Sequence, residues 1–142
     1  MKRILFYVIS ATWGGVMSLL GLVATLILFP FAERRVFHGR IYTVIGTNWG
    51  GVCLGCFFFV GKSSANSDHT RAHECGHGLQ NCIWGPLFPF VIAIPSMIRY
   101  WYREYTWRKN PSKYQTLPNY DAIWFEGQAT QWGKKYILTD II

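Results

Sequence analysis

The longest uncharged segment of the chain sets the first limit on its fold. Residues 4–31 read ILFYVISATWGGVMSLLGLVATLILFPF and contain no charged side chain. A helix that crosses the hydrocarbon core of a bilayer needs about 20 apolar residues. A secretory signal peptide has a shorter apolar core, of about 7–15 residues, followed by a small-residue cleavage site. FPFAERR does not look like such a site, so we expect a retained transmembrane helix in an anchor over residues 1–33.

The composition also favours a membrane setting. The chain has 51% hydrophobic residues, only 15% charged residues and a formal net charge of +7. Basic and aromatic residues alternate between positions 99 and 113, a mixture that is typical of a membrane–water interface. We therefore expect a lipid bilayer as a partner. No RNP, KH or zinc-knuckle pattern accompanies these residues, and we expect no nucleic acid.

A second uncharged segment, residues 41–61, reads IYTVIGTNWGGVCLGCFFFVG. It is long enough to cross a bilayer, but its five glycines make it a poor helix. The β-branched and aromatic residues toward its ends favour strands. We prefer a β-hairpin of Tyr42–Ile45 and Val52–Val60 with a turn around TNWGG, and a second spanning helix is the alternative.

A helix is expected from about His69 to Cys82. The preceding GKSSANSDHT is small and polar, which is typical of a loop. Asp68 or Thr70 can cap the helix, and the GP dipeptide at 85–86 can end it.

The remainder of the chain is expected to be mainly helical. Residues 86–98 are apolar but short and contain three prolines, which favours a membrane-interfacial segment at about 86–105 over a full span. A last helix can start at Asn119 or Asp121 and end near Gly133. The predicted fold class is mainly α with a small β-hairpin.

The motif HECGH, residues 73–77, carries the strongest chemical signal. Residues four apart share one face of a helix, so His73 and His77 can bind a single metal ion. Glu74 lies about 100 degrees round the helix, where it can accept a proton from a water molecule that the metal activates. This is the H-E-x-x-H pattern of zinc peptidases, and it predicts Zn²⁺ as the cofactor.

A catalytic zinc usually has three protein ligands, and the third must come from elsewhere in the chain. The best candidate is Glu126, a carboxylate in an otherwise apolar helix with the small residues Gly127 and Ala129 beside it. Asp121 and His69 remain as alternatives. Asp121 can instead cap a helix, and His69 lies at a loop junction.

The cysteines are expected to pack rather than to bind metal. Cys53 and Cys56 form a CLGC pair, but no second CxxC follows, and both lie in an apolar segment. Cys75 lies about 200 degrees round the helix from His73, so we expect it to face away from the metal.

HECGHGLQ, GPLFPFVIAIPS and EGQATQWG together resemble a group of small bacterial membrane-associated proteins with an HExGHxxQ motif. These proteins look like minimal gluzincins, zinc metallopeptidases whose third ligand is a downstream glutamate. The resemblance covers about residues 45–133. It implies His73 and His77 as ligands, Glu74 as catalytic base and Glu126 as third ligand.

The resemblance also implies an architecture. In zincins a strand before the motif helix holds the substrate in extended form, which suits residues 52–60. It therefore implies a minimal zincin-like α+β metal-binding domain over residues 41–142. Cys75 departs from the pattern, because an aromatic residue is usual there.

The expected function is that of a membrane-anchored zinc metallopeptidase, which hydrolyses peptide bonds with zinc-activated water and Glu74 as general base. Its substrate is a peptide or protein. The alternative is a non-catalytic membrane scaffold whose HExxH site is structural or vestigial. The positive-inside tendency of residues 34–40 and 99–113 places the motif on the cytoplasmic side, at a bacterial inner membrane by the resemblance.

Overall fold

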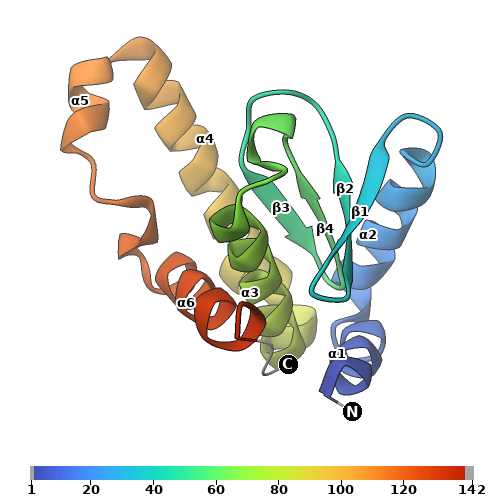
Figure 1. Ribbon diagram of the computed structural model, residues 1–142. Helices are drawn as coiled ribbons and strands as arrows, with labels where there is room; N and C mark the ends of the chain where they lie inside the picture. Colours follow the sequence, from blue (N-terminus) through green and yellow to red (C-terminus); the bar gives the residue numbers. More distant parts are fainter. Residues whose placement is uncertain (1, 140–142) are drawn as a thin grey trace.

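The computed structural model describes residues 2–139, which form a mainly helical molecule with one small mixed sheet (Figure 1). The helices are α1 Lys2–Ala11, α2 Gly15–Ile27, α3 Asp68–Trp84, α4 Ile94–Lys109, α5 Pro111–Thr116 and α6 Trp124–Trp132. The strands are β1 Glu33–Phe37, β2 Arg40–Val44, β3 Gly51–Leu54 and β4 Phe57–Val60. Short π-helical turns, Pro89–Ala93 and Gly133–Ile137, precede α4 and follow α6.

The N-terminal apolar segment forms two helices rather than one. α1 and α2 meet at 94°, and the break falls between Ala11 and Gly15. Glycine destabilises a helix interior, and side-chain contacts with α3 hold the break in place: Asn81 Nδ2 donates to the Gly14 carbonyl, and Trp13 Nε1 donates to the Ile83 carbonyl. The predicted single transmembrane helix is therefore wrong.

Over residues 2–139, no single helix combines the length and the apolar character that crossing a bilayer requires. Two bent pairs meet the requirement jointly. They are α1 with α2, and residues 68–87 with residues 89–109, the latter bent by 119°.

The sheet has the strand order β1-β2-β4-β3. β1 pairs with β2 and β3 pairs with β4, both antiparallel, whereas β2 and β4 run parallel. Strands do form where they were predicted, but Tyr42–Ile45 and Val52–Val60 are not the two arms of one hairpin. Residues 51–60 are themselves a hairpin, because Gly55 adopts a φ of +70° that permits a tight turn.

Side chains alternate across the two faces of the sheet. Cys53 and Phe58 pack with Cys75 of α3 on one face. Leu54 and Phe57 point to the other face, where they approach Gly21 of α2. The hairpin β3–β4 is thus held between α2 and α3, and β3 remains at the edge of the sheet beside α3.

The C-terminal helix begins later than predicted. Residues 120–122 form a 3₁₀ turn, and α6 starts at Trp124 with Ile123 in the N-cap position and no side-chain cap. The caps predicted at Asn119 and Asp121 are therefore wrong. Packing of Phe125 in a cluster with Met17, Phe88 and Ile92 positions α6 instead.

Candidate metal centre

The motif helix α3 starts at a side-chain cap. Ser67 is the N-cap, and its hydroxyl accepts a hydrogen bond from the Thr70 backbone N–H at 3.2 Å. The predicted caps, Asp68 and Thr70, are therefore wrong. Asp68 lies in the first turn, where its charge is favourable at the helix N-terminus, and it pairs with Arg71 at 2.6 Å.

Helix α6 crosses α3 at very short range. A Cβ atom added at Gly76 would collide with the backbone of Ala129, and one added at Gly133 would collide with the backbone of Ala72. The absence of side chains at these two glycines lets the backbones touch. This contact brings Glu126 on α6 over the two motif histidines on α3.

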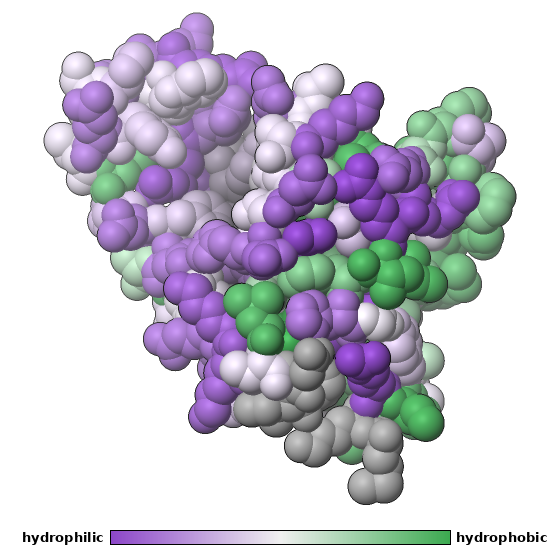
Figure 2. Space-filling model, in the orientation of Figure 1, coloured by the Kyte–Doolittle hydropathy of each residue, from purple (hydrophilic) through white to green (hydrophobic). Residues whose placement is uncertain are grey.

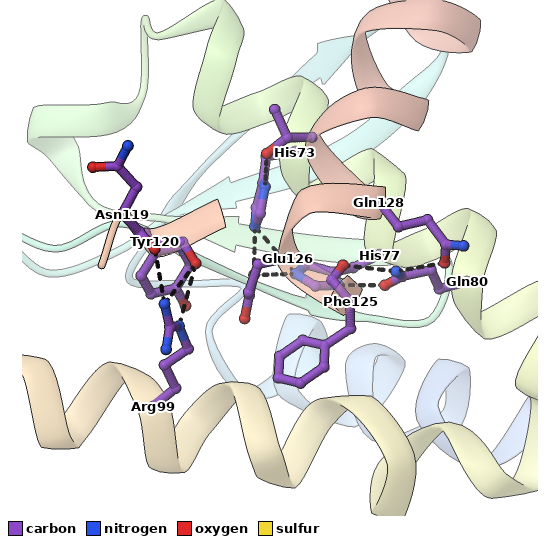
Figure 3. A network of polar contacts seen from close by, with 10 residues as sticks. His73, His77, Gln80, Arg99, Asn119, Tyr120, Phe125, Glu126 and Gln128 are labelled. Carbon is purple, nitrogen blue, oxygen red and sulfur yellow. Dashed lines mark hydrogen bonds and ion pairs between the residues drawn. The ribbon is translucent and has the colours of Figure 1, made fainter. Parts of the chain in front are cut away.

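His73, His77 and Glu126 converge on one point (Figure 3). His73 Nε2 lies 3.1 Å and His77 Nε2 lies 3.2 Å from Glu126 Oε2, and the two Nε2 atoms are 3.1 Å apart. Three ligands of a tetrahedral Zn²⁺, with bonds of about 2.0–2.1 Å, are separated by about 3.3 Å. The three side chains are buried, and their geometry can hold a metal ion.

Gln80 determines which nitrogen of His77 faces this point. Gln80 Nε2 donates to the Phe125 carbonyl at 2.8 Å and to Gln128 Oε1 at 3.0 Å. The amide oxygen of Gln80 therefore faces His77 Nδ1, at 2.7 Å, and accepts its proton (Figure 3). In the neutral ring, His77 Nε2 is left with a lone pair, which is the form that binds metals.

His73 has an equivalent partner. Its Nδ1 lies 2.8 Å from Thr130 Oγ1 of α6. When this hydroxyl accepts the Nδ1 proton, the Nε2 atoms of His73 and His77 and the carboxylate of Glu126 present three lone pairs to one point. Three acceptors in such close contact repel one another unless a proton or a metal cation lies between them.

The electrostatics of Glu126 agree with a cation site. Burial raises the pKa of Glu126, but the contacts with His73 and His77 outweigh it and hold the pKa well below its usual range. Burial lowers the pKa of His77, and the contact with Glu126 outweighs it and leaves the pKa raised. Glu126 Oε1 is buried and has no hydrogen-bond partner among residues 2–139, so this oxygen is available to a metal.

Glu74 lies beside the three ligands without joining them. It is 4% exposed and faces the two cavities described below. Burial raises its pKa, and the two motif histidines oppose the shift only in part. Its carboxylate fits against the bare backbone of Gly51 on β3, where a Cβ atom would lie 2.6 Å from Oε1. A buried carboxylate of raised pKa beside a metal site is suited to accept a proton.

Two cavities meet at the centre. The larger, of about 740 Å³, runs between the start of α3 and the later part of α4. The smaller, of about 450 Å³, runs between α2, β3 and the start of α4. Both are lined by Gly51, His73, Glu74, Tyr100 and Tyr120. Because they share these residues, the two cavities form one cleft that passes His73 and Glu74.

The alternative ligands lie outside the trio. His69 and Asp121 line the larger cavity, and neither belongs to the group of converging ligand atoms. Cys75 packs toward the sheet, away from the metal as expected, and burial raises its pKa to about 12. Cys53 is buried in the same cluster, as expected, and burial also raises its pKa.

Several residues that build the centre escaped the sequence analysis. Gln80 and Thr130 orient the histidines, Gly51 makes room for Glu74, and Gly76 sets the distance to α6. Gln80 had a usable signal, since it lies three residues after His77 on the same helix. Thr130 and Gly51 had none, because their roles depend on which segments meet in three dimensions.

The chain was compared with models of known protein families, with curated proteins and with solved structures. None of the three comparisons found a match.

Proposed function

We propose that this protein is a zinc-dependent peptidase, with His73, His77 and Glu126 as metal ligands and Glu74 as general base. One observation carries the proposal. Three buried ligand atoms from α3 and α6 lie 3.1–3.2 Å apart, and Glu74 faces the cleft directly beside them. This is the arrangement that peptide hydrolysis by a metal-assisted water needs.

The residues divide the reaction between them. A bound Zn²⁺ supplies Lewis-acid polarisation of the scissile carbonyl and lowers the pKa of water toward about 7. Glu74 accepts the proton of the attacking water and passes it to the leaving amine. The raised pKa of Glu74 makes this carboxylate a stronger proton acceptor than an ordinary glutamate.

Tyr120 is the best-placed donor for the developing oxyanion. Its ring lies 6.2 Å from that of His73, and it lines both cavities. Arg99 of α4 fixes this segment, because its guanidinium donates to the carbonyls of Asn119 and Tyr120 (Figure 3). Tyr100 also lines both cavities, whereas Tyr114 and His69 line only the larger one.

The substrate chain is proposed to lie along β3. This strand is at the edge of the sheet, and Gly51 and Val52 line the cleft beside Glu74. An extended peptide can pair with the open edge of such a strand through main-chain hydrogen bonds. It would then present its carbonyl to the proposed ligands.

We also propose that the protein sits at a lipid bilayer. α2 carries a row of large apolar side chains that are exposed: Val16, Leu19, Leu20, Leu22, Val23, Leu26 and Ile27. Figure 2 shows hydrophobic side chains gathered over α2, at the right of the molecule. An exposed apolar surface of this kind is expected to bind lipid or another apolar partner.

A non-catalytic scaffold is the second candidate. The observation that favours it is the burial of the centre, since Glu126 has no exposed surface and the metal would bridge α3 and α6. In that case Glu74 would have no chemical task.

The deciding experiment compares metal content and peptide hydrolysis. Purified wild type should contain about one zinc per chain and should cleave denatured casein. Glu74→Gln should keep the zinc and lose at least about 10²-fold in activity, because general-base catalysis contributes about 10²–10⁴-fold. Glu126→Gln should lose both.

The matched control is Glu33→Gln, the same change at an exposed position of β1. It should leave zinc and activity unchanged. Zinc in the wild type with no Glu74-dependent hydrolysis would favour a scaffold with a structural metal, and a wild type that does not bind zinc would exclude the peptidase and leave a scaffold whose HExxH site is vestigial.

A further inference from the structure

The two halves of the cleft differ in chemical character. The smaller half is lined mainly by apolar side chains from α2, β3 and the start of α4, among them Met17, Leu20, Leu54, Ile94 and Met97. The larger half, which we call the polar half, has a mixed lining in which aromatic residues alternate with polar and charged ones, among them Asn48, Arg103, Glu104, Arg108 and Asp121. His73 and Glu74 line both halves, and His77 lines the smaller one.

The apolar half opens onto the apolar surface of the molecule. Leu20, Met97 and Trp101 line it, and they are 53%, 54% and 60% exposed. Leu20 belongs to the exposed row on α2. The mouth of this half is therefore continuous with the surface that we place at the bilayer.

Helix α4 changes character in the same direction as the cleft. Its first residues, Ile94–Ile98, are apolar except for Ser96, and they line the apolar half through Ile94, Ser96 and Met97. From Arg99 to Lys109 the helix carries alternating basic and aromatic residues, and this part lines the polar half through Arg103, Trp107 and Arg108. Such a sequence of apolar and then basic–aromatic residues matches the passage from hydrocarbon to the lipid headgroups.

We infer that the substrate is a membrane-anchored polypeptide, which the protein cleaves where its chain leaves the bilayer. The apolar end of the substrate lies in the half between α2 and the start of α4. Its polar continuation crosses the proposed ligands into the half beside Arg103. This inference rests on the proposed function.

The exposure of the cleft mouth favours a membrane-anchored chain over a soluble peptide. When the row on α2 and the start of α4 contact lipid, Leu20, Met97 and Trp101 are covered by hydrocarbon. The mouth of the apolar half can then be entered only by a chain that is itself in the bilayer. A soluble peptide would reach the ligands only from the polar half.

The test measures binding without requiring turnover. Zinc-loaded Glu74→Gln protein in vesicles of phosphatidylcholine and phosphatidylglycerol is irradiated with a peptide of about 20 Leu and Ala residues followed by a polar tail. A benzophenone amino acid marks the junction. We expect labelling of Leu20, Ile94 or Met97, at least about tenfold stronger than with the polar tail alone, because burying apolar side chains favours the longer peptide. Equal labelling by both peptides, or labelling outside the cleft, would overturn the inference.

Neighbouring variants separate the cleft from membrane binding in general. Met97→Gln should reduce the labelling several-fold, because a polar group then enters the apolar half. Ile98→Gln makes a similar change at a neighbouring exposed position that does not line the cavity, and its labelling should match that of the parent protein. An equal loss in both variants would mean that only contact with lipid was affected.

The outcomes distinguish this inference from the proposed function. Glu74-dependent cleavage of casein without preferential labelling would leave a peptidase and reject the membrane-anchored substrate. Preferential labelling of the cleft by a protein that hydrolyses neither casein nor the anchored peptide would support the binding surface and reject the peptidase.

Discussion

The fit between Glu74 and Gly51 depends on the absence of a single methyl group. Gly51→Ala would place a Cβ atom 2.6 Å from Glu74 Oε1 and 2.8 Å from its carboxyl carbon. The carboxylate would have to move away from the cleft, and small displacements of a catalytic group cost about 10²-fold in rate. We therefore expect a loss of activity on that order with an unchanged zinc content.

Gly50→Ala is the matched control, because nothing lies within 4 Å of a Cβ atom added there. Its activity should stay within about twofold of wild type. If Gly51→Ala were as active as Gly50→Ala, the position of Glu74 would not matter to the reaction.

The amide of Gln80 should tune metal affinity without touching the metal. Gln80→Ala removes the acceptor of the His77 Nδ1 proton, so the ring is no longer held in the tautomer that binds metal. Loss of such a partner typically weakens metal affinity by about 10–100-fold. Competition with a zinc chelator would measure this change, and Gln115→Ala on the exposed face of α5 should leave the affinity unaltered.

The sequence predicted the individual ligand residues, but not the residues that hold them in position. His73 and His77 could be paired because helical spacing alone puts them on one face. Glu126 could be proposed because a carboxylate in an apolar helix needs a partner. Gly51 could not be assigned, since its task is set by a strand and a helix that are far apart in the sequence.

The metal centre depends on the close contact between helices α3 and α6. Gly76→Ala would push a methyl group into the backbone of Ala129 and force the two helices apart. We expect a loss of about 1–3 kcal/mol in the free energy of unfolding, as for other overpacked sites. Because Glu126 moves with α6, zinc affinity should fall as well.

Urea unfolding and chelator competition on the same samples would check both effects. Gly15→Ala at the start of α2 is the control, because a Cβ atom added there meets nothing within 4 Å. Unaltered zinc affinity in Gly76→Ala would show that the close helix contact does not position Glu126.

The local sequence pattern predicted where strands form better than it predicted which strands pair. The β-branched and aromatic residues between 41 and 61 do form strands, but β2 pairs with β4 in parallel, and β1 supplies the other neighbour of β2. Strand propensity is local, whereas pairing depends on long connections and on which helices cover each face. The same limit applies to α1 and α2, where contacts with α3 override the apolar run.

For the whole molecule, a bound metal should act as a cross-link. The proposed ligands join residues 73–77 to residue 126, and a ligand that binds only the folded state stabilises it by about 4 kcal/mol at 1,000 times its Kd. Removing the metal with a chelator should lower the Tm by on the order of 10 °C. The Glu126→Gln protein should show almost no chelator effect, and an equal shift in both proteins would place the metal elsewhere.

Membrane topology was the least predictable property from sequence. Apolar length argued for one spanning helix, but length does not record the 94° turn between α1 and α2. The assignment of the motif to the cytoplasmic side relied on that helix, and it stays a prediction.

The packing of α1 and α2 against the rest of the fold predicts what cleavage of the chain after α2 would do. The N-terminal helices interlock with the rest of the fold, since Tyr7 donates to the Gly39 carbonyl and Met17 packs with Phe88 and Phe125. A nick in the exposed loop at 29–32 would sever the peptide bond and leave these contacts in place. The two fragments should then stay associated, and the N-terminal piece, supplied separately, should complement a chain that lacks it.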